Sequence, residues 1–105
     1  MKTSGNTVLI TGGATGIGLA LAEALLKEGN EVLICGRRED KLREAKKKHP
    51  ALEVKTCDIS KPGDRKALAD WAIGNFSANV LVNNAGMQRM VNFKKGLGEL
   101  EAGDN

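Results

Sequence analysis

The amino-acid sequence predicts an α/β fold built on a doubly wound parallel sheet of about four strands with three helices. Short apolar runs alternate along the chain with longer segments in which apolar residues recur at helical spacing. In the first, second and fourth runs the hydrophobicity is continuous, which indicates strands buried on both faces, as in a parallel sheet. Right-handed crossovers, with the fourth strand returning beside the first, give the order 3-2-1-4 and put the third helix on the face opposite the first two.

The strands are expected at the apolar runs, which cover residues 7–10, 32–35, 52–57 and 80–82. Helices are expected between them. The first helix is apolar around much of its surface, so we expect it to be well buried and to end at Gly29. The residues expected on one of its faces are Ile17, Ala20, Leu21, Ala24 and Leu25. The second, about 39–48, has a thin inner stripe of Leu42 and Ala45, and the third covers about 64–76, with Leu68, Trp71, Ala72 and Phe76 on one face.

The stretch TVLITGGATGIG, residues 7–18, places four glycines between the first strand and the first helix. A loop at this junction presents main-chain N–H groups and the positive end of the helix dipole to an anion. Gly12 would allow a tight turn, Gly16 the close approach of a pyrophosphate, and Gly18 the close packing of the helix on the strand. A glycine-rich turn without a ligand is the alternative, but the position of the loop in the first strand–helix unit favours dinucleotide binding.

Two motifs follow the first and the fourth predicted strands. The first is Thr11-Gly12-x-x-x-Gly16-Ile17-Gly18, and the second is Asn83-Asn84-Ala85-Gly86. In both, the chain resembles the short-chain dehydrogenase/reductases, with their TGxxxGxG and NNAG motifs. The resemblance implies a Rossmann-like fold that binds a nicotinamide dinucleotide, of which this chain is the N-terminal cofactor-binding half. The cofactor-binding residues implied in these motifs are Thr11, Gly12, Ala14, Thr15, Gly16, Ile17, Gly18, Asn83, Asn84, Ala85 and Gly86.

The same resemblance implies an adenine site after the third strand. Asp58 matches the aspartate that contacts the adenine in this family, and Ile59 would be its neighbour that bonds through the backbone. Asp58 is alternatively a helix or turn cap, because Ser60 and Pro62 follow closely. Asn83 is, by resemblance, a brace between the central strands beside the cofactor, and alternatively a turn residue.

The residues after the second strand predict which dinucleotide is bound. A free ribose 2′-hydroxyl is usually held by a carboxylate at the end of this strand. Here Arg37 and Arg38 come first, and Glu39 and Asp40 follow them. A guanidinium forms bidentate, charge-assisted bonds to a phosphate, and in the family basic residues at this place go with a 2′-phosphate. We therefore predict NADP(H) over NAD(H), with both arginines as ligands; alternatively they belong only to the basic face of the second helix.

The resemblance also implies hydride transfer between the cofactor and a carbonyl or alcohol, for which the chain lacks the catalytic groups. Such a reaction needs a proton donor and stabilisation of the developing oxyanion. In the family a serine and a Tyr-x-x-x-Lys pair, on elements after the fourth strand, provide them. The 105 residues contain no tyrosine, and His49 is interpreted as a solvated residue. We predict no catalytic residue here, and therefore a chain that is catalytically incomplete by itself.

Composition indicates one globular domain over residues 1–105, with 41% hydrophobic and 28% charged residues. No apolar run reaches the ~20 residues that cross a bilayer, and the N-terminus does not resemble a secretory signal. We therefore expect a cytoplasmic protein without a membrane partner. Cys35 and Cys57 lack metal-ligand spacing and are interpreted as small buried hydrophobic residues with reduced thiols, so no metal site is predicted.

Two alternatives come from other functional classes. The net charge of +3 lies mostly between Arg37 and Lys48 and would suit a nucleic acid. The aromatic residues Trp71, Phe76 and Phe93 all lie outside that segment, so no nucleic-acid partner is predicted. The other alternative is a structural or oligomerising fragment that binds no cofactor.

The end of the sequence carries a further expectation about assembly. With the elements after it missing, the fourth strand would be a sheet edge with unpaired main-chain groups. Residues 80–82 are therefore expected to mediate self-association into a homo-oligomer. Residues from about 90 to 105 are expected to form a mobile tail, because glycines recur there.

Overall fold

The computed structural model describes residues 4–84 and 90–92 of the chain. Its elements alternate between strand and helix as far as β4. In chain order they are β1 (Thr7–Thr11), α1 (Gly16–Lys27), β2 (Glu31–Gly36), α2 (Glu39–Lys48), β3 (Glu53–Thr56), α3 (Pro62–Ala69), the π-helical segment η1 (Asp70–Asn75), β4 (Val80–Asn83) and β5 (Met90–Asn92). The third predicted helix is therefore α3 continued by η1, and it begins at Pro62, whose fixed φ suits a first helical turn.

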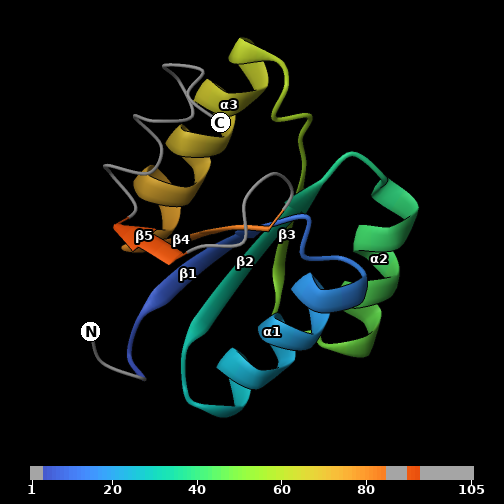
Figure 1. Cartoon of the computed structure of the whole chain (residues 1–105), viewed down its shortest axis with the longest axis vertical. Coiled ribbons are helices and arrows are strands. Elements are labelled where there is room, and N and C mark those ends of the chain that lie inside the picture. The colour runs from blue at the N-terminus through green and yellow to red at the C-terminus, as the bar shows by residue number, and fades with distance from the viewer. Residues whose placement is uncertain (1–3, 85–89, 93–105) are drawn as a thin grey trace.

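The sheet has the order β3-β2-β1-β4-β5, and its first four strands are parallel. The predicted order 3-2-1-4 is confirmed. The central strand β1 lies between β2 and β4, with Val8 beside both Val32 and Val80. Figure 1 shows the strands side by side, with α1 and α2 on one side of the sheet and α3 on the other. Strands β2 and β3 lie on one side of β1 and β4 lies on the other, so the order in which strands are added reverses at β1 and creates the topological switch between β1 and β4.

Strand β4 is not the sheet edge that the sequence predicted. Strand β5 pairs with it in antiparallel orientation, so that Leu81 lies beside Val91. The side chains of Val80, Leu81 and Val82 are buried, with exposed fractions of 6% or less. The expected route to self-association, an unpaired edge at residues 80–82, is therefore wrong. Of the expected tail, residues 90–92 form β5 and residues 93–105 lie outside the described residues.

The two faces of the sheet carry separate cores, because successive side chains of a strand point to opposite faces. One core joins β1, β2 and β4 to Ala22 of α1 and to Leu42 and Ala45 of α2. The other joins the same strands to Leu68 of α3 and Ala72 of η1. Leu42 and Ala45 are almost completely buried, which confirms the predicted inner stripe of the second helix.

Helix α1 is less buried than predicted. Only Gly18 and Ala22 are buried within it, while Ile17 is 72% exposed and Ala20 and Ala24 are exposed as well. The helix approaches the sheet most closely at Gly18 and Ala22, and of the predicted face only Leu21 and Leu25 pack against the core. The predicted end is confirmed: Gly29 has φ +88°, a left-handed conformation that glycine adopts without strain.

The cysteines and the lengths of the helices can also be compared with the sequence predictions. Cys35 and Cys57 are both buried free thiols. Within residues 4–84 and 90–92, every helix is too short or too polar to span a bilayer.

Candidate functional site: a pocket at the ends of three parallel strands

The carboxyl ends of β1, β2 and β3 open into a pocket of about 380 Å³. It is the crevice in which doubly wound sheets bind ligands. Three connections form its walls: the glycine loop (residues 12–15), the β2–α2 turn (residues 37–38) and the β3–α3 loop (residues 57–61). The lining residues are Thr11, Gly12, Ala14, Thr15, Cys35, Gly36, Arg37, Arg38, Lys41, Cys57, Asp58, Ile59 and Ser60.

The glycine loop leads directly from β1 into the first turn of α1. Gly12 (φ +68°) and Gly16 (φ +60°) both have left-handed backbone conformations. A Cβ atom at Gly16 would meet no other atom within 4 Å, so the space beside this residue is open. A Cβ at Gly18 would lie 2.4 Å from the Gly12 carbonyl oxygen, so only glycine lets α1 pack this closely on the loop. These are the two properties that the sequence assigned to an anion-binding turn.

Gly13, which is not one of the glycines of the motif, is needed for the close packing of the loop on β2. A Cβ at Gly13 would lie 2.5 Å from Cγ2 of Ile34 on β2. The amide of Gly12 also donates a hydrogen bond to the Cys35 carbonyl (2.9 Å). The hydrogen bond and the lack of a side chain at Gly13 together let the loop lie against β2 where it bends toward the helix. The run of two glycines, 12 and 13, was the sequence signal for this close approach.

The start of α1 lies next to the pocket and has no side-chain cap. Thr15 is the N-cap residue and makes no side-chain capping bond, and no acidic residue lies in the first turn. Ala14 and Thr15 line the pocket, whereas Ile17 is exposed on the first turn of the helix. An uncapped helix start next to open space favours an anion, because its N–H groups and the helix dipole carry positive charge.

The two asparagines after β4 are tied to the glycine loop. The Thr11 hydroxyl donates to Oδ1 of Asn83 (3.0 Å), and Asn84 Nδ2 donates to the Gly12 carbonyl (3.2 Å). Asn83 is the last residue of β4 and is 5% exposed. It therefore joins the two central strands instead of forming a turn. Ala85 and Gly86, the other residues of this motif, lie outside the described residues.

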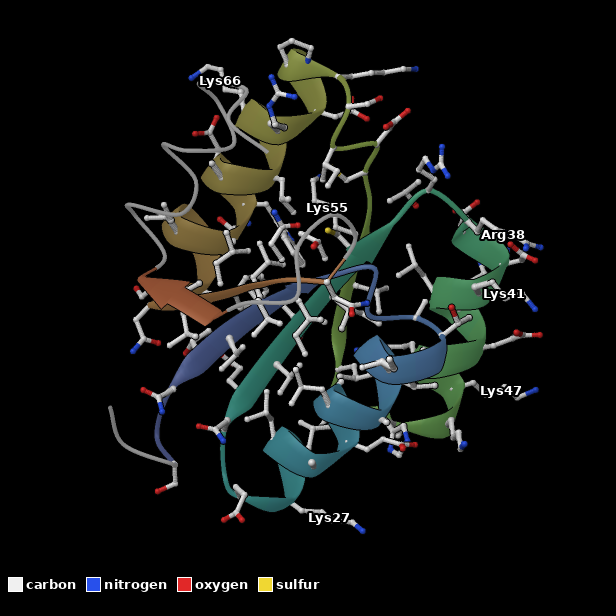
Figure 2. The ribbon with its side chains drawn as sticks, in the orientation of Figure 1. Lys27, Arg38, Lys41, Lys47, Lys55 and Lys66 are labelled. Carbon is white, nitrogen blue, oxygen red and sulfur yellow. The ribbon has the colours of Figure 1, made fainter. Side chains whose placement is uncertain are left out.

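The β2–α2 turn makes the basic wall of the pocket. Arg37 and Arg38 line it, and so does Lys41 from the first turn of α2. Figure 2 shows Arg38 and Lys41 near the N-terminal end of α2, with Lys47 farther along the helix. Sequence reasoning missed Lys41, although its spacing of three residues from Arg38 was a signal, since such residues share one side of a helix.

The acidic residues after β2 are occupied by neighbouring cations. Asp40 pairs with Arg38 (3.2 Å between Oδ2 and Nη2), and Glu39 pairs with Arg43 (3.3 Å). Strand β2 itself ends at Gly36, where an added Cβ atom would meet no atom within 4 Å. The position from which a carboxylate could reach a ribose hydroxyl therefore has space but no side chain.

The β3–α3 loop holds Asp58 in a hydrogen-bonded turn. Its Oδ1 accepts bonds from the amide (3.0 Å) and the hydroxyl (2.6 Å) of Ser60. These bonds, together with the positive charge of Arg37 nearby, lower the pKa of the Asp58 carboxyl, so it is ionised at neutral pH. The turn geometry is the one expected from the alternative interpretation of Asp58, and the residue nevertheless lines the pocket, as does Ile59.

The two cysteines are buried as predicted, and His49 differs from its expected surroundings. Cys35 of β2 and Cys57, which follows β3, both line the pocket; a hydrogen bond with Cys57, together with burial, raises the pKa of the Cys35 thiol. His49 is not solvated as predicted: its side chain is 27% exposed, and its Nε2 lies 2.6 Å from Oε2 of Glu23 on α1. This contact joins the end of α2 to α1 and lies apart from the residues that line the pocket.

Comparison with known proteins gives one consistent result. A family model described as short chain dehydrogenase matches residues 6–99. A Bacillus subtilis (strain 168) protein named uncharacterized oxidoreductase DltE is 54% identical over 101 residues, which cover 95% of this chain and 40% of that protein. A glucose 1-dehydrogenase of Gluconobacter oxydans is 41% identical over 93 residues, or 83% of this chain and 35% of that protein.

Solved structures agree with the sequence matches. An actinorhodin polyketide ketoreductase with NADPH has a TM-score of 0.73 and 35% identity, over 82% of this chain and 35% of that one. A Pseudomonas aeruginosa RhlG/NADP active-site complex has a TM-score of 0.70 and 34% identity, over 80% and 36% of the two chains. The chain thus spans well under half the length of these four proteins.

Proposed function

Because the chain belongs to the short chain dehydrogenase family, we propose that it forms the NADP(H)-binding portion of an oxidoreductase of this kind. The family model covers residues 6–99, and the order of the four parallel strands agrees with the solved relatives. The observation that carries the proposal is the pocket at the ends of β1, β2 and β3. Its glycine loop is open at Gly16 and leads into an uncapped helix start.

The pyrophosphate would be held by main-chain N–H groups of the glycine loop and of the first turn of α1. The adenosine end would lie between the β2–α2 turn and the β3–α3 loop, where Asp58 and Ile59 line the pocket. Thr11, Asn83 and Asn84 would hold the loop in its open shape through their hydrogen bonds to each other and to Gly12. The nicotinamide, when bound, supplies or accepts the hydride that is exchanged with a carbonyl or alcohol.

NADP(H) is favoured over NAD(H) by the charges of the basic wall. Arg37, Arg38 and Lys41 line the pocket at the end of β2; of the nearest acids, Asp40 pairs with Arg38 and Glu39 pairs with Arg43. A 2′-phosphate gains charge-assisted bonds there that a hydroxyl does not gain. Two of the similar solved structures, the ketoreductase and RhlG, are complexes with NADPH and NADP.

Catalysis itself is assigned to residues outside this sequence. The 105 residues contain no tyrosine, so the general acid that the family resemblance implies is not among them. The chain is expected to bind NADP(H) without reducing a carbonyl. A cytoplasmic location and a homo-oligomeric assembly remain predictions, which fractionation and sedimentation would test.

The nucleic-acid alternative has less support once the lysines of α2 are placed. Lys46 Nζ donates to the carbonyls of Pro50 (3.0 Å) and Leu52 (2.6 Å), and Lys48 lies 3.7 Å from Glu23. Two of the three consecutive lysines therefore have partners within the protein. The other group of basic residues in this segment lines the pocket; it consists of Arg37, Arg38 and Lys41.

Calorimetry with NADPH and NADH tests the proposal directly. We expect tighter binding of NADPH, and an Arg37→Ala variant should weaken it by roughly 10- to 100-fold, as expected for a lost hydrogen bond to a charged group. Affinity for NADH should be almost unchanged. Arg43→Ala, which removes an exposed arginine of α2 that does not line the pocket, is the matched control. No binding of either cofactor would overturn the function, and equal affinities would overturn only the preference for NADP(H).

A further inference from the structure

The β3–α3 loop is held in place from outside the pocket by two side chains of α3. Oδ2 of Asp64 accepts a hydrogen bond from the main-chain amide of Asp58 (2.9 Å). Nη1 of Arg65 donates to the carbonyl oxygen of Ile59 (2.8 Å). Neither Asp64 nor Arg65 lines the pocket, so both act on residues that do. We call Asp64 and Arg65 the α3 clamp.

The clamp fixes both ends of one short piece of main chain. It holds the N–H group of Asp58 at one end and the C=O group of Ile59 at the other. Further main-chain bonds join the loop to its surroundings, from Cys57 to the Gly36 carbonyl (2.8 Å) and from Lys61 to the Asp58 carbonyl (3.0 Å). The peptide between Asp58 and Ile59 is thereby left little freedom to rotate, which sets the direction of the Asp58 carboxylate.

The burial of Arg65 indicates that this arrangement is costly. Its Nε atom is buried and has no hydrogen-bond partner within the described part of the chain. A buried donor without a partner lowers the stability of the fold, because its hydrogen bonds to water are lost and not replaced. A lysine at this position could still reach a carbonyl with its single ammonium group and would bury no such atom. The hydrogen bond from Arg65 to the Ile59 carbonyl oxygen is the interaction in the structure that offsets the cost of burying Nε.

We propose that Asp64 and Arg65 are positioning residues that aim the β3–α3 loop at the adenine, so that the pocket discriminates between purine bases. This inference rests on the proposed function, because it presumes that the adenine lies against Asp58 and Ile59. An ionised carboxylate has room for several hydrogen bonds, so Asp58 can accept one from the 6-amino group of adenine besides those from Ser60. The clamp would act on this discrimination without touching the cofactor.

The test compares NADPH with its reduced hypoxanthine analogue, in which an oxygen replaces the 6-amino group of adenine. We expect the unchanged protein to bind NADPH about tenfold more tightly than the analogue, since one hydrogen bond to a charged group is lost. Asp64→Ala and Arg65→Met should each bring this ratio close to one by weakening NADPH alone. Arg65→Lys should restore most of the ratio. Lys66→Ala is the control, because this exposed lysine of the same turn points away from the sheet in Figure 2.

The outcomes separate the inference from the function beneath it. If the unchanged protein binds neither cofactor, the proposed function fails as well. If it binds both equally, or if folded clamp variants keep the ratio of the unchanged protein, only the inference is overturned. Should Asp64→Ala or Arg65→Met not fold, Asp64→Asn decides: its neutral oxygen should leave a ratio of about threefold, because charge-assisted bonds are roughly twice as strong. An unchanged ratio in folded Asp64→Asn would overturn the inference.

Discussion

The glycine loop and the β3–α3 loop form facing parts of one pocket and are built on different physical principles. The glycine loop is shaped by what it lacks: there is no side chain at Gly16, where space is open, and none at Gly18, where α1 touches the loop. The β3–α3 loop is shaped by contacts, since Asp58, Ile59 and Ser60 are held by side chains of their own loop and of α3. A phosphate site thus needs main chain without side chains, whereas a site for a base needs polar groups held in fixed directions.

The largest effect is expected where a side chain would enter the bare part of the pocket. Gly18→Val should destabilise the fold by about 3 kcal/mol, because its Cβ would lie 2.4 Å from the Gly12 carbonyl oxygen and the helix would have to move. Thermal unfolding should show a Tm lowered by about 10 °C or more, and NADPH binding should be lost.

Another glycine supplies the control for this prediction. Gly63 lies in α3, its added Cβ would meet no atom within 4 Å, and it is not among the residues with positive φ. Gly63→Ala should therefore leave NADPH binding unchanged and raise stability by up to about 1 kcal/mol. If Gly18→Val were as stable as Gly63→Ala, the close approach of α1 to the loop would be refuted.

The next largest effect concerns the basic wall between these two loops. Gly36→Asp would place a carboxylate at the end of β2, where the structure has space for it. The carboxylate should repel a 2′-phosphate and accept a bond from a 2′-hydroxyl, which changes the ratio of NADPH to NADH affinity by roughly 10- to 100-fold toward NADH. Gly36→Asn has the same size without the charge and should change the ratio much less. Equal effects of both substitutions would show that size, not charge, sets the preference.

The bare loop could be predicted from the sequence, and the contacts of the other loop could not. Glycines at positions 12, 16 and 18 show by residue type alone where the main chain has no side chain and can adopt left-handed conformations, so their spacing after an apolar run predicts the turn and the helix start. Asp58 was found only through a family motif, and its alternative role in a turn with Ser60 turned out to describe its actual bonds.

The residues that the sequence did not reveal act through contacts between elements. Asp64 and Arg65 looked like ordinary polar residues of a helix, because a bond to a main-chain atom leaves no pattern in composition or periodicity. The extent to which α1 is buried was predicted wrongly for a related reason. Much of its surface is apolar, so periodicity could not choose one face, and the small size of Gly18 and Ala22 decided which side packs closest.

The smallest expected effect lies outside the pocket and separates the stability of the scaffold from the shape of the site. The contact of Glu23 with His49 joins α1 to α2 (2.6 Å). The hydrogen bond with His49 lowers the pKa of Glu23 below its ordinary value of 4.5, although burial opposes this. A carboxyl whose pKa is lower in the folded protein adds stability above its unfolded pKa, and this stability is lost as the pH falls through the folded value.

Glu23→Gln should therefore lower the Tm slightly at pH 7, and the difference from the unchanged protein should shrink as the pH drops below 4.5. Thermal unfolding at a series of pH values measures it. Glu28→Gln is the control, because Glu28 follows the same helix and makes no salt bridge within residues 4–84 and 90–92. Affinity for NADPH should stay constant in both variants, because neither residue lines the pocket. A loss of NADPH affinity in Glu23→Gln alone would mean that the contact between α1 and α2 also sets the position of the basic wall, and that the pocket depends on side-chain contacts well beyond the β3–α3 loop.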